Sequence, residues 1–107
     1  EQNNEYGKKI GQEIIVQLVS INEVFDKVLA ENPNAKILLK LDCEGEEYAI
    51  FDMLKETTYL NHVAIAIIEW HEKGASDIEK VLMHHQFKLR QTHHVTENSG
   101  MIYAIKN

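Results

Sequence analysis

The sequence has little of what builds cross-linked, repetitive or membrane-spanning proteins. Its 107 residues include one cysteine, one proline and five glycines. A single cysteine excludes an internal disulfide bond, and so little proline and glycine excludes collagen-like or low-complexity sequence. No apolar run approaches the roughly 20 residues that a membrane-spanning helix needs. Positive charge is also scarce, because 11 basic residues stand against 17 acidic ones and leave a net charge of −6.

This charge balance bears on partners. Nucleic acids and anionic membranes attract basic proteins, so we expect neither a nucleic-acid partner nor a membrane. The composition, 44% hydrophobic and 26% charged, is that of one globular domain over residues 1–107. A lone thiol fits a reducing compartment, so we expect a cytoplasmic location. The chain starts at Glu1 rather than at a methionine, and we expect a further N-terminal piece before it.

Apolar periodicity and turn residues predict alternating strands and helices. Glu1–Gln12 is polar and is interpreted as a tail or lead-in. Ser20 and Glu23 form a capping-box pattern at the start of a helix, which the proline-containing turn after Glu31 ends. The expected strands are Ile14–Val19, Lys36–Leu41, Val63–Trp70, Phe87–Val95 and Met101–Ile105, and the expected helices are Ile21–Glu31, Glu46–Glu56 and one over Asp77–His85.

The fold class that follows is α/β, with the order β-α-β-α-β-α-β-β. The run Val63–Ile68 is continuously apolar, which is typical of a central parallel strand buried on both faces. The turn Glu97–Gly100 is short, so the last two strands are expected to form an antiparallel hairpin.

Ionisable side chains follow two consecutive strands at their carboxyl ends, where open α/β sheets bind ligands. Asp42 ends the strand Lys36–Leu41, with Glu44 and Glu47 close behind it, while Glu69 and His71 end the next strand. If these strands are neighbours, their acids converge at one edge of the sheet. Asp42, Glu69 and His71 could then bind a divalent cation, or one of the site residues could act as a base toward a hydroxyl group.

Simpler interpretations stand beside this one. Asp42 could merely cap the helix that starts near Gly45, a glycine that suits the tight turn there. Cys43 lies between two acids, whose charge raises a thiol pKa, and is expected to be a buried structural thiol. Tyr48 and Trp70 are most simply core aromatics. Of the six histidines only His71 lies at a strand's carboxyl end and is a functional candidate. His62 is not one, and the pairs His84–His85 and His93–His94 are expected to be surface residues.

The run Leu39–Tyr48 resembles the K-x-D-x-E-G-x-E signature of the FkbM-type methyltransferase family, with Lys40 and Glu47 as its outer members. Ile67–His71 is similar to that family's later I-x-E-x-H pattern. Val16–Asp26 and Gly100–Lys106 resemble the segments before and after these motifs, so the resemblance spans nearly the whole chain.

The resemblance implies a Rossmann-like O-methyltransferase that uses S-adenosylmethionine and acts on hydroxyl groups of sugars or secondary metabolites. It marks Asp42, Glu44, Glu69 and His71 as the catalytic candidates, and a divalent cation held by Asp42, Glu69 and His71 remains open. The glycine-rich loop and ribose-binding acid of the family's cofactor site do not occur here. The chain therefore resembles the C-terminal, acceptor-side half of the domain, with a partial sheet.

Two rival functions remain open. The chain could be a non-catalytic interaction domain, in which the strand Lys36–Leu41 has an unpaired edge and joins a homodimer or a partner protein. It could also be a small metal-binding protein, although three ligands alone leave an open site. A complete methyltransferase would instead take a small hydroxyl compound as its partner.

Overall fold

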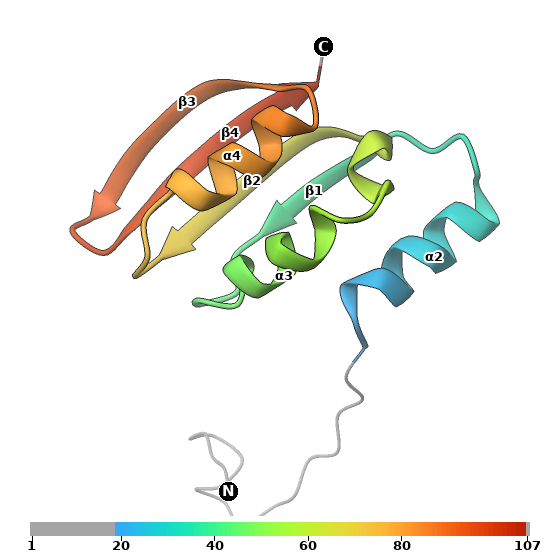
Figure 1. Ribbon diagram of the computed structural model, residues 1–107, viewed down its shortest axis with the longest axis horizontal. Coiled ribbons are helices and arrows are strands. Elements are labelled where there is room, and N and C mark those ends of the chain that lie inside the picture. The colour runs from blue at the N-terminus through green and yellow to red at the C-terminus, as the bar shows by residue number, and fades with distance from the viewer. Residues whose placement is uncertain (1–18, 107) are drawn as a thin grey trace, which may run out of the picture.

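The structure is a computed structural model that describes residues 19–106. The expected lead-in Glu1–Gln12 and the expected strand Ile14–Val19, apart from Val19 itself, lie outside these residues. The described elements, in chain order, are α2 (Ile21–Glu31), β1 (Ile37–Leu41), α3 (Glu47–Leu54), the 3₁₀ helix η1 (Tyr59–His62), β2 (Val63–His71), α4 (Ser76–His84), β3 (Phe87–Thr96) and β4 (Ser99–Lys106). The α/β class is confirmed (Figure 1).

Four strands form one mixed sheet in the order β1-β2-β4-β3. The strands β1 and β2 pair in parallel, with Leu41 opposite Ile68, so both run toward the same edge. The strand β4 is antiparallel to both β2 and β3, which confirms the C-terminal hairpin. Its turn is tighter than expected, because Ser99 and Gly100 already belong to β4 and pair with β3.

Helices α3 and α4 lie over one face of the sheet, which we call the helix-covered face (Figure 1). Phe51 and Leu54 of α3 and Ile78 and Leu82 of α4 are fully or almost fully buried there. They pack against the alternate strand residues that point to the same side, namely Leu39, Leu41, Ala66, Ile68, Ile102 and Ala104. Alternation along each strand gives the sheet this apolar face.

The opposite side of the sheet, which we call the open face, is much less buried among the described residues. One row of it runs across three strands from Leu38 through Ile65 to Ile105. These side chains are 59%, 37% and 37% exposed. The expectation that β2 is buried on both faces is therefore wrong for this part of the chain, although β2 does lie between two other strands.

Helix α2 has the bounds that its capping box predicts. The Ser20 hydroxyl accepts a hydrogen bond from Glu23 N, and the Glu23 carboxylate accepts one from Ser20 N. Figure 1 shows α2 beyond the β1 edge of the sheet. Its buried residue, Phe25, stacks on Tyr59 of η1 with the ring centroids 4.9 Å apart.

Lys106 anchors the C-terminal end of β4 to neighbouring elements. Its ammonium group donates hydrogen bonds to the backbone oxygens of Leu60 and His85 and lies 4.3 Å from the centroid of the Phe87 ring. Burial lowers the pKa of Lys106. These contacts tie the last strand to η1 and to the end of α4. None of the helices in residues 19–106 is long and apolar enough to cross a membrane.

Candidate functional site

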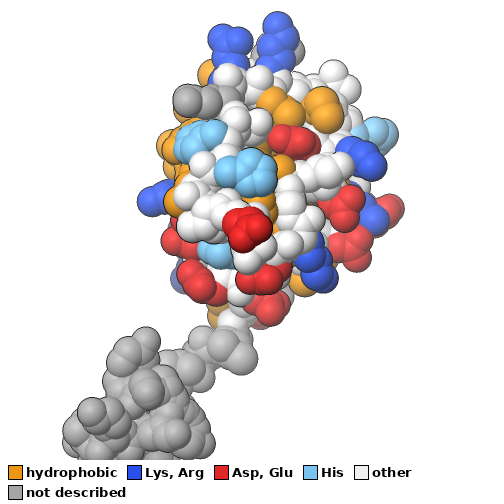
Figure 2. All heavy atoms as spheres, turned by 90° about the vertical axis from the view of Figure 1, so that its left-hand side faces the viewer, with side chains coloured by type: hydrophobic (Ala, Val, Ile, Leu, Met, Phe, Trp, Pro, Cys, Tyr) orange, Lys and Arg blue, Asp and Glu red, His pale blue; other side chains and the backbone are white. Residues whose placement is uncertain are grey.

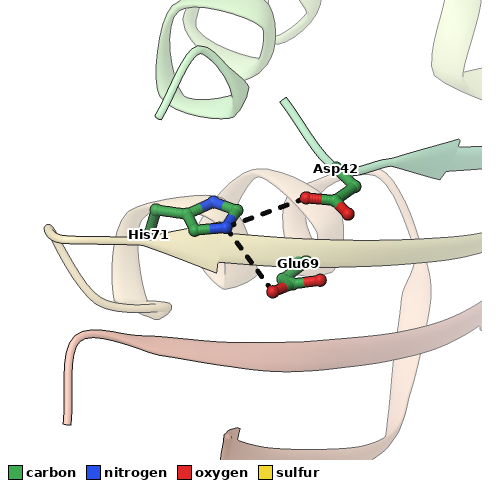
Figure 3. A group of neighbouring side chains, drawn as sticks. All are labelled: Asp42, Glu69 and His71. Carbon is green, nitrogen blue, oxygen red and sulfur yellow. Dashed lines mark ion pairs between the residues drawn. The ribbon is translucent and has the colours of Figure 1, made fainter. Parts of the chain in front are cut away.

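The parallel pairing of β1 and β2 places their carboxyl ends at one edge of the sheet. Asp42 follows the last residue of β1, while Glu69 and His71 lie at the end of β2. All three side chains meet there, as the strand-end argument predicts (Figure 3). Figure 2 looks onto this end of the molecule and shows acidic side chains and histidines gathered on it. The predicted convergence is confirmed.

The His71 imidazole is the centre of the group. Its Nε2 lies 3.7 Å from Asp42 Oδ1, 3.5 Å from Glu69 Oε2 and 3.8 Å from Glu44 Oε2. These distances exceed those of ordinary hydrogen bonds but allow ion pairing when the ring is protonated. The His71 side chain is 14% exposed, whereas that of Glu44 is 84% exposed. Three of the four expected residues therefore form a compact group, with Glu44 at its outer rim.

Behind the imidazole lies Glu47, the first residue of α3. Its Oε2 is 3.0 Å from His71 Nδ1, and its Oε1 accepts a hydrogen bond from Gly45 N at 3.1 Å. The Glu47 side chain is completely buried. A buried carboxylate is costly unless both oxygens have partners, and here each oxygen has one. Glu47 therefore fixes the direction of the ring and turns Nε2 toward the acids.

The charges around His71 govern its protonation. The hydrogen bond to Glu47 raises the pKa of His71, the negative charges of Glu47, Glu44 and Glu69 raise it further, and burial opposes them. When the ring is neutral, Nδ1 carries the hydrogen that Glu47 accepts, and the lone pair on Nε2 is free. In that form Nε2 can accept a proton or bind a metal ion.

The turn between β1 and α3 brings Glu47 back under the strand ends. Glu44 and Gly45 are both left-handed, with φ of 52° and 108°. Gly45 thus has the backbone role expected of it, because side chains disfavour that conformation. No side chain caps the N-terminus of α3, so the interpretation of Asp42 as a helix cap is wrong.

The donor set also fits a divalent cation. One ligand atom each from Asp42, Glu69 and His71 lie within 4.8 Å of one another. Carboxylate oxygens and an imidazole nitrogen suit several divalent metals. A carboxylate on the second ring nitrogen, as Glu47 provides, is the usual partner of a metal-bound histidine.

The remaining sequence candidates lie outside this group. Lys40 is exposed on the open face and makes no ion pair with the described site residues. Cys43 is half-buried, and burial followed by the charges of Glu47, Asp42 and Glu46 raises its pKa, the direction that the sequence predicts. His93 and His94 point to opposite faces, where they lie against Tyr103 and Trp70 respectively.

The sequence alone does not reveal the importance of Glu47 and Tyr48 for the site. Glu47 is there only an outer member of the signature, although it makes the shortest contact to His71. Tyr48 has the pattern of a core aromatic, but it is only half-buried and its hydroxyl bonds the loop after His71. One sequence signal could have identified both residues: the helix starts directly after a strand that ends in acids. The first turn of such a helix faces the same edge of the sheet as those acids.

The fold and the site together define a class of protein: an α/β domain with acids and a histidine at the carboxyl ends of neighbouring strands. The family model of the methyltransferase FkbM domain matches residues 1–95. No curated protein and no solved structure matches the chain. Since the model covers most of the sequence, the chain belongs to the FkbM methyltransferase domain family.

Proposed function

We propose that this chain forms the acceptor side of an O-methyltransferase, in which His71 removes the proton from a hydroxyl group of a sugar or secondary metabolite. The observation that carries the proposal is the Glu47–His71 hydrogen bond of 3.0 Å, which leaves Nε2 directed at the acidic edge. The family membership supports methyl transfer as the reaction.

S-adenosylmethionine would supply the methyl group and retain the electron pair of the broken carbon–sulfur bond. The described residues do not fit this cofactor, because their strand ends carry acids, His71 and a single glycine turn at Gly45 rather than a glycine-rich loop. We therefore assign cofactor binding to sequence outside residues 19–106. The cofactor-binding N-terminal half is expected upstream.

Each described residue has a definite part in the proposed step. The acceptor O–H bond breaks, its proton passes to His71 Nε2, and the oxygen becomes the nucleophile. Glu47 stabilises the imidazolium that forms, because its carboxylate already faces Nδ1. Asp42 and Glu69 lie on the same side as Nε2 and can hold the acceptor through its hydroxyl groups.

The decisive test uses the protein extended upstream of Glu1 and a labelled methyl donor. Replacement His71→Gln should lower methyl transfer by about 10²–10⁴-fold, the usual contribution of a general base. Cofactor binding should remain unchanged. The matched control is His93→Gln, an exposed histidine on β3 that should leave transfer intact. Full activity in His71→Gln would overturn the assignment.

A divalent cation is the alternative way to activate the same hydroxyl. Asp42, Glu69 and His71 would hold the ion, which lowers the pKa of a bound hydroxyl group. Calorimetric titration of this chain with Mg²⁺, Mn²⁺ and Zn²⁺ separates the two roles. Binding that Asp42→Asn abolishes favours the metal, and no heat with any ion leaves His71 as the base.

A second candidate function is an interaction domain that pairs with another copy of itself. The specific observation is that β1 ends the described sheet while apolar side chains near it are exposed: Leu38 on β1 and Val24 and Val28 on α2. Unpaired strand edges recruit further strands. Sedimentation at high micromolar concentration should then show a dimer, and a monomer there would contradict this function.

A further inference from the structure

The Tyr48 hydroxyl holds the loop that follows β2. Its Oη donates a hydrogen bond to Gly74 O at 2.8 Å and accepts one from Lys73 N at 3.1 Å. A phenol has one hydrogen to donate, and here both its donor and an acceptor position are used. The Lys73 ammonium group also lies 5.6 Å from the centroid of the Tyr48 ring. One side chain on α3 thus makes several contacts to a loop that is distant in sequence.

That loop, residues 72–75, begins directly after His71 and has an unusual backbone. Glu72 and Gly74 are left-handed, with φ of 68° and 81°. Left-handed backbone at a residue other than glycine is costly and persists only where surrounding contacts impose it. Besides the bonds to Tyr48, Glu72 N donates to Asn98 O and Lys73 N to His71 O, both at 2.7 Å, and Ala75 O accepts from Glu79 N at 2.9 Å.

Helix α3 therefore holds His71 at two places. Glu47 is hydrogen-bonded to the ring at Nδ1. Tyr48, the next residue, is hydrogen-bonded to the backbone of Lys73 and Gly74, two and three positions after His71. Because successive residues on a helix point about 100° apart, one turn can reach both the ring and the loop. We propose that Tyr48 is a positioning residue, which sets the placement of His71 against Glu47 through the β2–α4 loop. The inference deepens the proposed function and rests on it where it assigns His71 the role of base.

The test is the tautomer of His71 in Tyr48→Phe. Phenylalanine keeps the ring and removes both hydroxyl hydrogen bonds. In the unmodified chain, at a pH where the ring is neutral, nitrogen-detected NMR should show the hydrogen on Nδ1, because Nδ1 faces the Glu47 carboxylate. In Tyr48→Phe that preference should be lost, so that the Nε2–H form becomes detectable, and the Lys73 amide should exchange faster with solvent.

The matched control is Tyr59→Phe. Tyr59 also donates a hydrogen bond from its hydroxyl, but the acceptor is the Asp26 carboxylate of α2, in a different part of the molecule. This variant should keep the Nδ1–H form of His71. An unchanged tautomer in folded Tyr48→Phe would overturn the proposal, as would failure of Tyr48→Phe to fold while Tyr59→Phe folds, since the hydroxyl would then act on global stability.

The NMR result does not depend on methyl transfer. In the upstream-extended protein, Tyr48→Phe should lower kcat by up to about 10²-fold, the scale of a displaced catalytic group. The KM for the methyl donor should be unchanged. If the protein transfers no methyl group at all, the proposed function fails, while the tautomer measurement still decides whether Tyr48 positions His71.

Discussion

Both faces of the sheet carry apolar strand residues, but the two faces differ in what covers them. Ile68 on the helix-covered face is fully buried, whereas Ile65, three positions earlier in the same strand, is 37% exposed. Both are apolar and both lie in the central part of the sheet. The comparison shows that an apolar residue in a strand can be either buried or exposed. Tertiary contacts, here the packing of α3 and α4, decide which of the two it is.

The largest expected effect comes from shortening one isoleucine on each face. Ile68→Ala should lower the free energy of unfolding by about 2–5 kcal/mol, because it leaves a cavity beneath α3 and α4. Ile65→Ala should cost about 1 kcal/mol or less, as for partly exposed positions. Urea unfolding of both variants measures the difference. Equal losses would show that the open face is as tightly packed as the other.

A second test overfills the helix-covered face. Gly100→Ala would press its new methyl group against the backbone oxygen of His93 and bring it within 2.6 Å of Trp70 Nε1, so we expect a loss of about 1–3 kcal/mol from overpacking. Trp70 is the protein's single tryptophan, so its fluorescence emission should change with the same substitution. The control is Gly74→Ala, where the space is open but φ is 81°; this variant should lose stability without altering the fluorescence.

The third test concerns His71, which has a carboxylate from each side of the sheet. Glu47 is the first residue of the covering helix α3 and is the largest cause of the raised pKa of His71, while Glu69 lies on the open face and contributes less. Glu47→Gln should therefore return the pKa of His71 toward its ordinary value, and Glu69→Gln should lower it less. NMR titration with a chelator present measures both. Equal shifts would contradict the ranking.

The same shift makes stability depend on pH. Because folding raises the pKa of His71, its protonation stabilises the folded chain fully below the unfolded value of about 6.5. That contribution is lost as the pH rises through the folded pKa. In Glu47→Gln this part of the pH dependence should shrink, which urea unfolding at about pH 6 and about pH 9 would show.

The smallest effect is expected at Leu38, the most exposed apolar residue of the open face. Leu38→Lys should change the free energy of unfolding by about 0.5 kcal/mol or less in the monomer. If copies pair along β1, the same variant should weaken their association in sedimentation experiments. A loss of stability above about 2 kcal/mol would instead indicate that this side chain is covered.

Local signals predict much of the fold. The capping box and the proline-containing turn determine α2 to the residue, and the strand-end argument alone brings Asp42, Glu69 and His71 together. Such predictions succeed because they depend on neighbours in sequence and on one general rule of α/β sheets.

The features that the sequence did not predict depend on contacts between distant segments. Apolar residues on the open face look the same in sequence as those beneath the helices. The hairpin turn is tighter than expected because Ser99 and Gly100 pair with β3, and Gly100 also lies opposite Trp70 of β2. Glu47 reaches His71 only because Glu44 and Gly45 adopt left-handed backbone, and Tyr48 reaches the next loop from the same turn of helix.

The position of β4 has a consequence for synthesis. This strand is the last described element in the chain, yet it lies inside the sheet between β2 and β3. While the ribosome is still making Ser99–Lys106, β2 lacks its neighbour on that side and Lys106 cannot yet bond Leu60 and His85. The sheet can therefore form completely only after these residues have left the ribosome. Until then the nascent chain has unpaired strands that chaperones can bind.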